Sequence, residues 1–395
     1  MKTNYTYTKI CCYIGYFVQA IINNFLPLLF VTFNIEYSLS YEKIGSLIVI
    51  NFVAQIFVDI ASVRLVNKFG YHKCTVIANL LAGVGLLMLS FLPRIMESTY
   101  IAIIISICFY AVGSGLIEVI ISPIIEYLPA NKKSSQMSLL HSFYCWGQAV
   151  TVLLSVFMFA VIGIKSWFYL PIIWSAVPFC DALLFIKAPI VDPERDMSKR
   201  SPKILKSKSF YLYVLVMLCA GASEITVSQW ASAFAEQGLH LSKTVGDLLG
   251  PTFFALLMGS ARLIYGIVGD RFNHQKALML SSAAAAVCYL GIVFGDTSLA
   301  VIFCGLCGFS VGIMWPVTLS MSSRRFKEGG ALMFGILAAA GDLGCSAGPF
   351  VASIFADKGG LKAGFLAATV FPVIMFSGVL VIFLKDYLAR KRKKY

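Results

Sequence analysis

The stretch IVDPERDMSKRSPKILKSK at residues 190–208 decides the fold, because it separates two long runs of apolar segments. It is polar, densely charged and contains two prolines, which is typical of a linker outside a membrane. Six apolar segments precede it and six follow it. Since a helix needs about 20 apolar residues to cross a bilayer core of roughly 30 Å, the layout predicts two halves, 1–189 and 209–395, joined by 190–208.

The apolar segments are continuous and do not alternate with polar residues, which favours helices over the strands of a membrane barrel. Hydrophobic residues make up 59% of the chain and charged residues 13%, whereas a soluble domain carries about 25% charge. The sequence therefore predicts an all-α polytopic membrane protein with twelve transmembrane helices. The expected spans are 8–32, 43–66, 74–93, 99–124, 136–162, 167–189, 209–235, 244–269, 277–295, 298–322, 330–356 and 362–386.

The distribution of Lys and Arg predicts the orientation. An even number of spans puts both termini on one side, and 25 of the 32 Lys and Arg residues fall on that side. Six fall on the opposite side, and Arg262 lies within a span. The positive-inside rule therefore places both termini in the cytoplasm of a cell-membrane protein. It also explains the net charge of +13 without a nucleic-acid partner, and the basic tail at 390–394 fits an anchor to anionic lipid.

Two loops at equivalent places in the halves resemble each other. The loop between spans 2 and 3 reads NKFGYHK (67–73), and the loop between spans 8 and 9 reads DRFNHQK (270–276). Four positions match at a constant offset of 203 residues. A match at the same point of a six-linker-six layout indicates an internal duplication.

These loops make the chain resemble the major facilitator superfamily of secondary transporters, whose signature there is close to GxxxDRxGRR. The second copy is the better one, with Gly266, Gly269, Asp270 and Arg271, while the first has Asn67 in place of the usual Asp. The resemblance implies two six-helix bundles around a central cavity, alternating access by rocking of the halves, a monomer, and no enzymatic activity.

The same loops suit a gate, because an acid and neighbouring cations at a helix end can latch to the facing bundle in one state only. Lys68, Asp270 and Arg271 are the candidates for gating. The alternative is that these charges only fix the topology.

Four further stretches resemble the fucose-permease and sugar-symporter branch of the family. They are GSGLIEVIISP (113–123), LLHSFYCWGQ (139–148), GASEITVSQW (221–230) and GDLGCSAGP (341–349). That branch can carry an acid in its first span, where this chain has Asn23 and Asn24. The Arg-containing fourth-span motif and the GxxxGP fifth-span motif of drug-efflux members are missing.

Five charged residues within the expected spans are candidates for a functional role: Glu118, Asp181, Glu224, Arg262 and Asp342. An ionised side chain near the bilayer centre costs at least about 2.5–3.5 kcal/mol, so such residues face a water-filled cavity, pair with each other or stay protonated. Glu118, Glu224 and Asp342 are the candidates for proton coupling, with structural hydrogen bonds between helices as the alternative. Arg262 and Asp181 lie toward the cytoplasmic ends of their spans, where snorkelling or a salt bridge to the gate loops is expected.

Neutral polar and aromatic residues supply candidates for solute binding. Amides both donate and accept hydrogen bonds, which suits sugar hydroxyls, and a tryptophan offers a flat surface to a sugar ring. Ordinary helix packing is the alternative for each. The candidates are Gln19 and Asn23 in the first span, His141 and Gln148 in the fifth, Trp230 in the seventh and Trp315 in the tenth.

The function expected is therefore secondary active transport of a small, polar, sugar-like solute, coupled to protons or another cation. An efflux transporter for amphipathic, drug-like compounds is the alternative. The sequence contains no HExxH motif, nucleophile elbow or phosphate loop, so a membrane enzyme is not expected. No cofactor or metal is expected either, since the Cys304–Cys307 pair stands alone inside a span.

Overall fold

The first half of the chain forms helices whose irregularities fall at proline and glycine. The computed structural model describes residues 5–128, 133–190, 202–268, 272–326 and 330–392. The first span consists of α1 (Thr6–Phe25), a 3-10 turn η1 (Leu26–Leu29) and α2 (Phe30–Glu36). Pro27 sits in η1, where its missing N–H interrupts the α-helical hydrogen bonds. The other elements are α3 (Tyr41–Ile95), α4 (Thr99–Tyr127), α5 (Lys133–Ile162), the 3-10 turn η2 (Ile164–Ser166) and α6 (Tyr169–Lys187).

The second half repeats this plan after a short 3-10 turn, η3 (Pro202–Lys206). Its first span is α7 (Lys208–Ala233) with the π-helical turn η4 (Phe234–Gly238). Its second begins with α8 (Lys243–Asp247) and the π-helical turn η5 (Leu248–Thr252) and continues as α9 (Phe253–Val268). The remaining helices are α10 (His274–Phe294), α11 (Thr297–Val311), α12 (Met314–Arg325), α13 (Gly330–Ala368) and α14 (Val370–Arg392).

The two longest elements, α3 and α13, each consist of two helices joined at a glycine whose backbone angles are not helical. Gly70 in α3 has φ 79° and ψ 160°, and Gly360 in α13 has φ 78° and ψ 172°. Glycine adopts positive φ without the steric cost that a Cβ would bring. The break at Gly70 separates the two spans predicted at 43–66 and 74–93.

The prediction of an all-helical polytopic membrane protein is confirmed. Within the described residues, eleven helical segments are long and apolar enough to cross a membrane. The last of them, Gly335–Ala389, contains the span predicted at 362–386 and most of the one predicted at 330–356. The division into two bundles at residues 190–208 stays a prediction, since most of that stretch lies outside the described residues.

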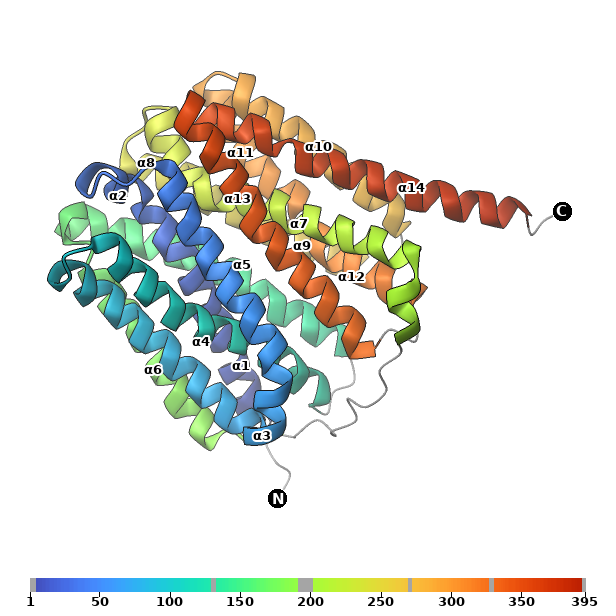
Figure 1. Cartoon of the computed structure of the whole chain (residues 1–395), viewed down its shortest axis with the longest axis horizontal. Coiled ribbons are helices and arrows are strands. Elements are labelled where there is room, and N and C mark those ends of the chain that lie inside the picture. The colour runs from blue at the N-terminus through green and yellow to red at the C-terminus, as the bar shows by residue number, and fades with distance from the viewer. Residues whose placement is uncertain (1–4, 129–132, 191–201, 269–271, 327–329, 393–395) are drawn as a thin grey trace.

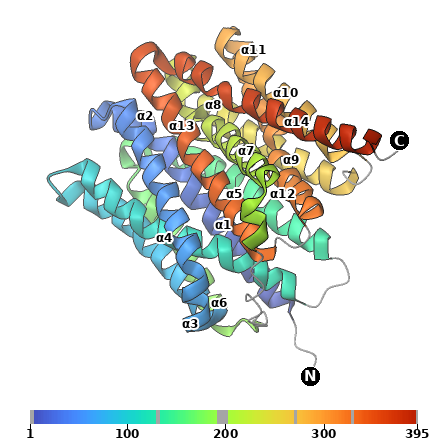
Figure 2. The same ribbon diagram turned by 45° about the vertical axis from the view of Figure 1, so that its right-hand side comes forward.

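The helices of each half pack mainly among themselves. In the first half α3 packs against α4 and α6, and α1 packs against α5. In the second half α13 packs against α7, and α10 packs against α11 and α14. The most extensive contacts between the halves are those of α3 with α13, which run side by side in Figures 1 and 2, and of α5 with α9.

The ends of the spans gather on two opposite faces of the molecule. We call the face with the end of α2 and the starts of α3 and α8 the far face. The face with the start of α1, the end of α9 and the end of α14 is the near face. In Figure 1 the far face lies at the upper left, around the labels α2 and α8, and α14 ends at the right.

Candidate functional site

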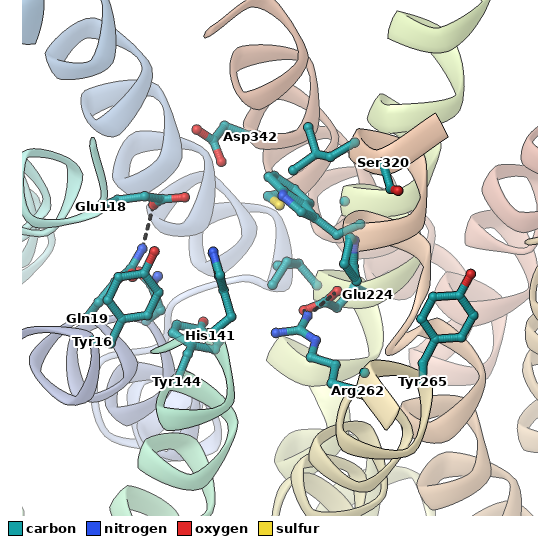
Figure 3. Close-up of a pocket in the computed structure, with 18 of the residues that line it drawn as sticks. Tyr16, Gln19, Glu118, His141, Tyr144, Glu224, Arg262, Tyr265, Ser320 and Asp342 are labelled. Carbon is teal, nitrogen blue, oxygen red and sulfur yellow. Dashed lines mark hydrogen bonds and ion pairs between the residues drawn. The ribbon is translucent and has the colours of Figure 1, made fainter. Parts of the chain in front are cut away.

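A cavity of about 470 Å³ lies between the halves, with walls from α1, α3, α4 and α5 on one side and α7, α9, α10, α12 and α13 on the other (Figure 3). It extends toward the near face, because Tyr265, Gly266 and His274 line it where α9 ends and α10 begins. Seven of the residues proposed for binding or proton coupling line this cavity: Gln19, Asn23, Glu118, His141, Glu224, Trp315 and Asp342. Their chemical roles stay predictions.

The wall from the first half carries an acid that is bound by an amide. Gln19 Nε2 of α1 donates a hydrogen bond of 2.5 Å to Glu118 Oε2 of α4 (Figure 3). An amide N–H can donate to a carboxyl oxygen whether or not the acid carries a proton. The Tyr16 ring meets the His141 ring edge-on, with centroids 5.2 Å apart. Ser114, four residues before Glu118 in α4, is buried, whereas the side chain of Ser122 lies outside the described atoms.

The wall from the second half carries an acid that is bound by a cation. Arg262 Nη2 of α9 lies 2.8 Å from Glu224 Oε1 and 3.0 Å from Oε2 of α7. Arg262 Nε donates to Gly312 O at 3.1 Å, and Nη1 donates to Cys145 Sγ at 3.3 Å. A partly buried ion pair persists when hydrogen bonds satisfy its remaining donors, as they do here.

The expectation for Arg262 was therefore wrong. Snorkelling or a salt bridge to the gate loops was predicted because Arg262 lies toward one end of its span. The face of α9 that carries it turns inward, so the guanidinium lies in the cavity wall (Figure 3).

Asp342 of α13 lines a third part of the wall, to which Trp315 of α12 also contributes. Its side chain is 3% exposed, and its Oδ2 has no hydrogen-bond partner among the described atoms. The neighbouring glycine makes room for the ring, because a Cβ at Gly341 would collide with Trp315. Gly341 thus allows α13 to pack closely against Trp315 of α12, while Asp342 itself lines the cavity.

Sequence reasoning missed a polar stripe on α3. Asn51, Gln55 and Asp59 follow one another at intervals of four residues and share a helix face. Asn51 Nδ2 and Gln55 Nε2 each donate a hydrogen bond of 3.2 Å to Asn23 Oδ1. The four-residue spacing inside an apolar span is the signal that could have found them.

Two of the expected binding residues do not line the cavity. Gln148 Nε2 donates to Ser228 Oγ at 2.9 Å, which joins α5 to α7. Trp230 is 1% exposed, and its Nε1 donates to Pro349 O of α13 at 3.2 Å. Trp230 lies a turn and a half beyond Glu224 toward the far face, among packed helices.

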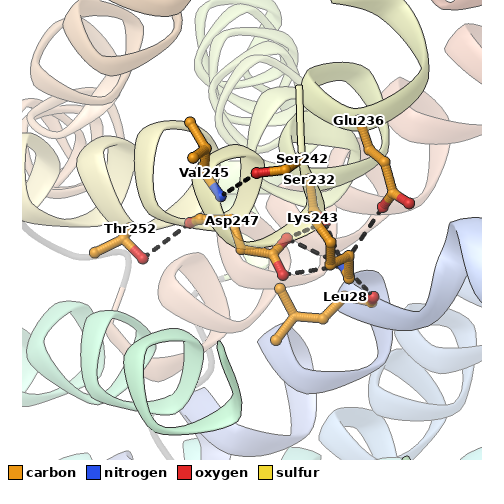
Figure 4. Close-up of polar contacts among 8 residues, drawn as sticks. All are labelled: Leu28, Ser232, Glu236, Ser242, Lys243, Val245, Asp247 and Thr252. Atoms are coloured by element: carbon orange, nitrogen blue, oxygen red, sulfur yellow. Dashed lines mark hydrogen bonds and ion pairs between the residues drawn. The ribbon is translucent and has the colours of Figure 1, made fainter. Parts of the chain in front are cut away.

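Polar contacts between the halves close the cavity at the far face. Lys243 Nζ of α8 donates to Leu28 O of η1 at 2.6 Å, and it also lies 3.0 Å from Asp247 Oδ2 (Figure 4). Ser232 donates to the same carboxylate. Nearer the cavity, Gln229 Nε2 donates to Asn23 O at 2.7 Å.

A second far-face contact joins α13 to the start of α3. The backbone N–H groups of Tyr41 and Glu42 each donate a hydrogen bond of 2.8 Å to an oxygen of Asp357. The first N–H groups of a helix have no partner within it and form the positive end of its dipole. A carboxylate from the second half thus caps a helix of the first half.

The proposed gating residues are only partly visible. Asp270 and Arg271 lie outside the described residues, so their position stays a prediction. Lys68 is exposed, with Nζ 5.2 Å from the Phe69 ring centroid. Asp181 does not snorkel as expected: it is buried near Gly15 of α1, and neither of its oxygens has a hydrogen-bond partner among the described atoms.

Comparisons with known proteins agree with this architecture. A sequence model of the family described as Major Facilitator Superfamily matches residues 12–333 and 249–394. The fold is similar to a D-xylose-proton symporter, with TM-score 0.78, 15% identity and 96% of each chain covered. It is also similar to the nucleoside transporter NupG, with TM-score 0.76, 12% identity and 95% and 99% of the chains covered.

Two further matches are weaker. The fucose:proton symporter FucP of E. coli gives TM-score 0.67 at 15% identity, over 96% of this chain and 99% of that one. A 187-residue stretch is 30% identical to an uncharacterized 38 kDa protein in the 23S RNA operon of Thermoproteus tenax. That match covers 45% of this chain and 46% of the relative, so it spans about half of the relative's length.

Proposed function

The chain belongs to the Major Facilitator Superfamily of secondary transporters, and on that premise we propose that it carries a small, polar, sugar-like solute coupled to protons. The cavity supports this proposal because hydrogen-bonding groups enter it from both halves. Gln19 and Asn23 come from the first half, and the Glu224–Arg262 pair comes from the second. A solute with several hydroxyl groups can bridge such walls, and Trp315 offers its ring a flat surface.

Glu118 is the proton carrier in this proposal. It lines the cavity, and its described partner is the neutral amide of Gln19. A carboxyl that is neutral in one access state and ionised in the other links proton movement to solute movement. Glu224 is less suited to this role, because Arg262 already contacts both of its oxygens.

The access route follows from the two faces. Contacts between the halves close the far face, whereas the cavity extends toward the near face. With the Lys and Arg bias as guide, the near face is cytoplasmic, and the structure is an inward-facing state. Asp270 and Arg271 would then close the near face in the opposite state, with Lys68 beside them.

The gate proposal has its own test. Replacing Asp270 with Asn should slow transport more than it weakens solute binding, because it disturbs the balance between access states. Equal losses of binding and transport would instead assign Asp270 to the solute site.

A thermal-shift screen of the purified protein tests the solute class. The set should contain sugars, nucleosides and lipophilic cations, because the similar structures include symporters of xylose and fucose and a nucleoside transporter. We expect a sugar to raise the unfolding temperature, and the effect to disappear in Gln19→Ala. Gln148→Ala is the matched control, since Gln148 lies outside the cavity. Stabilisation by lipophilic cations alone would support the efflux alternative.

A further inference from the structure

The cavity wall holds more acids than cations, and its cation is already engaged. Among the described residues that line the cavity, Arg262 is the single Lys or Arg, whereas three acids line it: Glu118, Glu224 and Asp342. Each of the three guanidinium nitrogens of Arg262 has a partner, namely a carboxylate, a thiol sulfur and a backbone carbonyl. The wall therefore offers little to an anionic solute.

The three acids differ in what binds them (Figure 3). Glu224 is paired with Arg262, and Glu118 accepts a hydrogen bond from Gln19. Asp342 is 3% exposed, and its Oδ2 has no hydrogen-bond partner among the described atoms. A buried polar atom without a partner costs free energy. Because Asp342 lines a binding cavity, a bound solute is the natural source of the missing donor.

The surroundings of Asp342 suit a donor that carries a positive charge. Trp315 of α12 packs against the backbone of Gly341, the residue before Asp342, and both Trp315 and Asp342 line the cavity. The face of an aromatic ring attracts a cation through its quadrupole. The helix packed along α13 is α3, whose polar stripe carries two amides and a further acid, Asp59. These groups favour a cation over an anion at this place.

We propose that the solute carries a protonated amine in addition to its hydroxyl groups, and that Asp342 binds this amine with Trp315 contributing its ring. The inference rests on the proposed transport of a sugar-like solute and names its class, an aminohexose. The amine donates a hydrogen bond to Asp342 Oδ2, and its charge offsets that of the carboxylate. Hydroxyl groups of the same solute bond to Gln19 and Asn23 on the opposite wall.

The proposal separates three kinds of solute. A sugar acid would bring a carboxylate into a wall that already holds three acids. A neutral sugar would leave the charge of Asp342 without a counterion. A lipophilic cation would satisfy that charge but would leave the amides of Gln19 and Asn23 facing an apolar surface, which costs free energy. A hydrophilic amine meets both requirements.

Matched pairs of hexoses test the proposal. Glucosamine, galactosamine and mannosamine differ from glucose, galactose and mannose at one position, where an amine replaces a hydroxyl group of similar size. Affinities are measured by titration calorimetry on the purified full chain, at a mildly acidic pH where the amines are protonated. We expect at least one amine to bind at least about tenfold more tightly than its neutral partner, the lower end of the range for a hydrogen bond to a charged group.

Two variants connect this preference to the residue. Asp342→Asn should bring the affinities for the amine and the neutral hexose together, because a neutral amide does not attract the ammonium charge. Asp181→Asn is the matched control, since it also changes a buried acid of a span, but one that lies against α1 within the first half. It should keep the full preference. Asp342→Ser takes the place of Asp342→Asn if that variant does not fold.

Three results would overturn the assignment. Equal affinity of the wild-type protein for all amines and their neutral partners would do so without any variant. A preference that survives in Asp342→Asn would place the amine elsewhere in the cavity. A rise of the unfolding temperature with sodium chloride over choline chloride, lost in Asp342→Asn, would assign the acid to a metal cation.

The same titrations distinguish this inference from the proposed function. If neutral hexoses bind as well as the amines, transport of a sugar-like solute stands and the amine assignment fails. If none of the hexoses binds, the solute class fails together with it.

Discussion

Glu118 and Glu224 enter the same cavity from opposite halves but have different partners. Arg262 contacts both oxygens of Glu224, at 2.8 and 3.0 Å, whereas a neutral amide contacts one oxygen of Glu118 at 2.5 Å. A cation stabilises the ionised form of its acid, while an amide tolerates both forms. The comparison shows that the residue type of an acid inside a membrane protein does not define its environment, because the environment depends on which group binds it. The two walls therefore differ, with an ion pair on one and an acid bound by a neutral amide on the other.

The largest effect is expected from removing the cation. Arg262→Ala leaves Glu224 without its partner in a mostly buried place, and breaking a buried pair in this way costs about 3–5 kcal/mol. We expect a large fall in the thermal unfolding midpoint of the purified protein in detergent. Glu224→Gln combined with Arg262→Ala should recover much of the loss, because no uncompensated charge remains. If the double variant is as unstable as Arg262→Ala, the lost stability comes from the packing of Arg262 and not from the unpaired charge of Glu224. The contrast between the two acids would then not hold.

The next test concerns the acid that is bound by the amide. Glu118→Gln mimics the protonated acid, so we expect solute exchange across a vesicle membrane to continue while pH-driven uphill accumulation is lost. The radiolabelled form of the solute that stabilises the protein most in the thermal-shift screen serves for both assays. Accumulation that persists in Glu118→Gln would show that another acid carries the coupling proton.

The sequence predicted the spans well because hydropathy and length are local properties. It also identified Glu118, Glu224 and Asp342 as unusual, since an acid in an apolar stretch is visible without a structure. The partners of these acids were not predictable in the same way. Arg262 was assigned to the membrane boundary because its position along the span was known, while the direction of its helix face was not.

The same limit explains why Gln148 and Trp230 were misplaced, but not why Asp59 was missed, since its polar face is visible in the sequence. Asp59 was overlooked within a span that otherwise reads as apolar, although Asn51 and Gln55 mark its face at four-residue spacing. Gln148 and Trp230 were expected in the cavity because of their chemistry. Their helices instead direct them into contacts with Ser228 and Pro349. Residue type indicated which side chains could bind a solute, and helix packing decided which of them reach the cavity.

A smaller effect is expected at the far face, where a third acid, Asp247, is paired with a cation. Lys243 also donates to Leu28 O of the other half, so this cation acts between the halves as well as within one. Lys243→Met should weaken far-face closure by about 1.5–3 kcal/mol, the range for a hydrogen bond to a charged group. Faster amide exchange at Tyr41 and Glu42 would report it. Unchanged exchange would show that Asp357 closes this face alone.

The smallest effects are expected from two tryptophan variants, one at a tryptophan packed between helices and one at a tryptophan in the cavity wall. Trp230→Phe removes one hydrogen bond to Pro349 O and should cost about 1 kcal/mol of stability, with solute affinity unchanged. Trp315→Phe should weaken solute binding and leave stability nearly unchanged, because Trp315 lines the cavity. Thermal unfolding with and without the solute measures both quantities. Weaker solute binding in Trp230→Phe would place the solute site nearer the far face.

The carboxylate that caps α3 has a consequence for how this protein tolerates sequence change. Asp357 binds two backbone N–H groups, which every residue except proline supplies. The side chains at positions 41 and 42 can therefore vary without removing the donors, whereas position 357 must keep an acceptor of the right length. This part of the far-face closure thus depends on one side chain from the second half and on two backbone N–H groups of the first. A contact of this kind lets one half accumulate substitutions at its surface without a matching change in its partner.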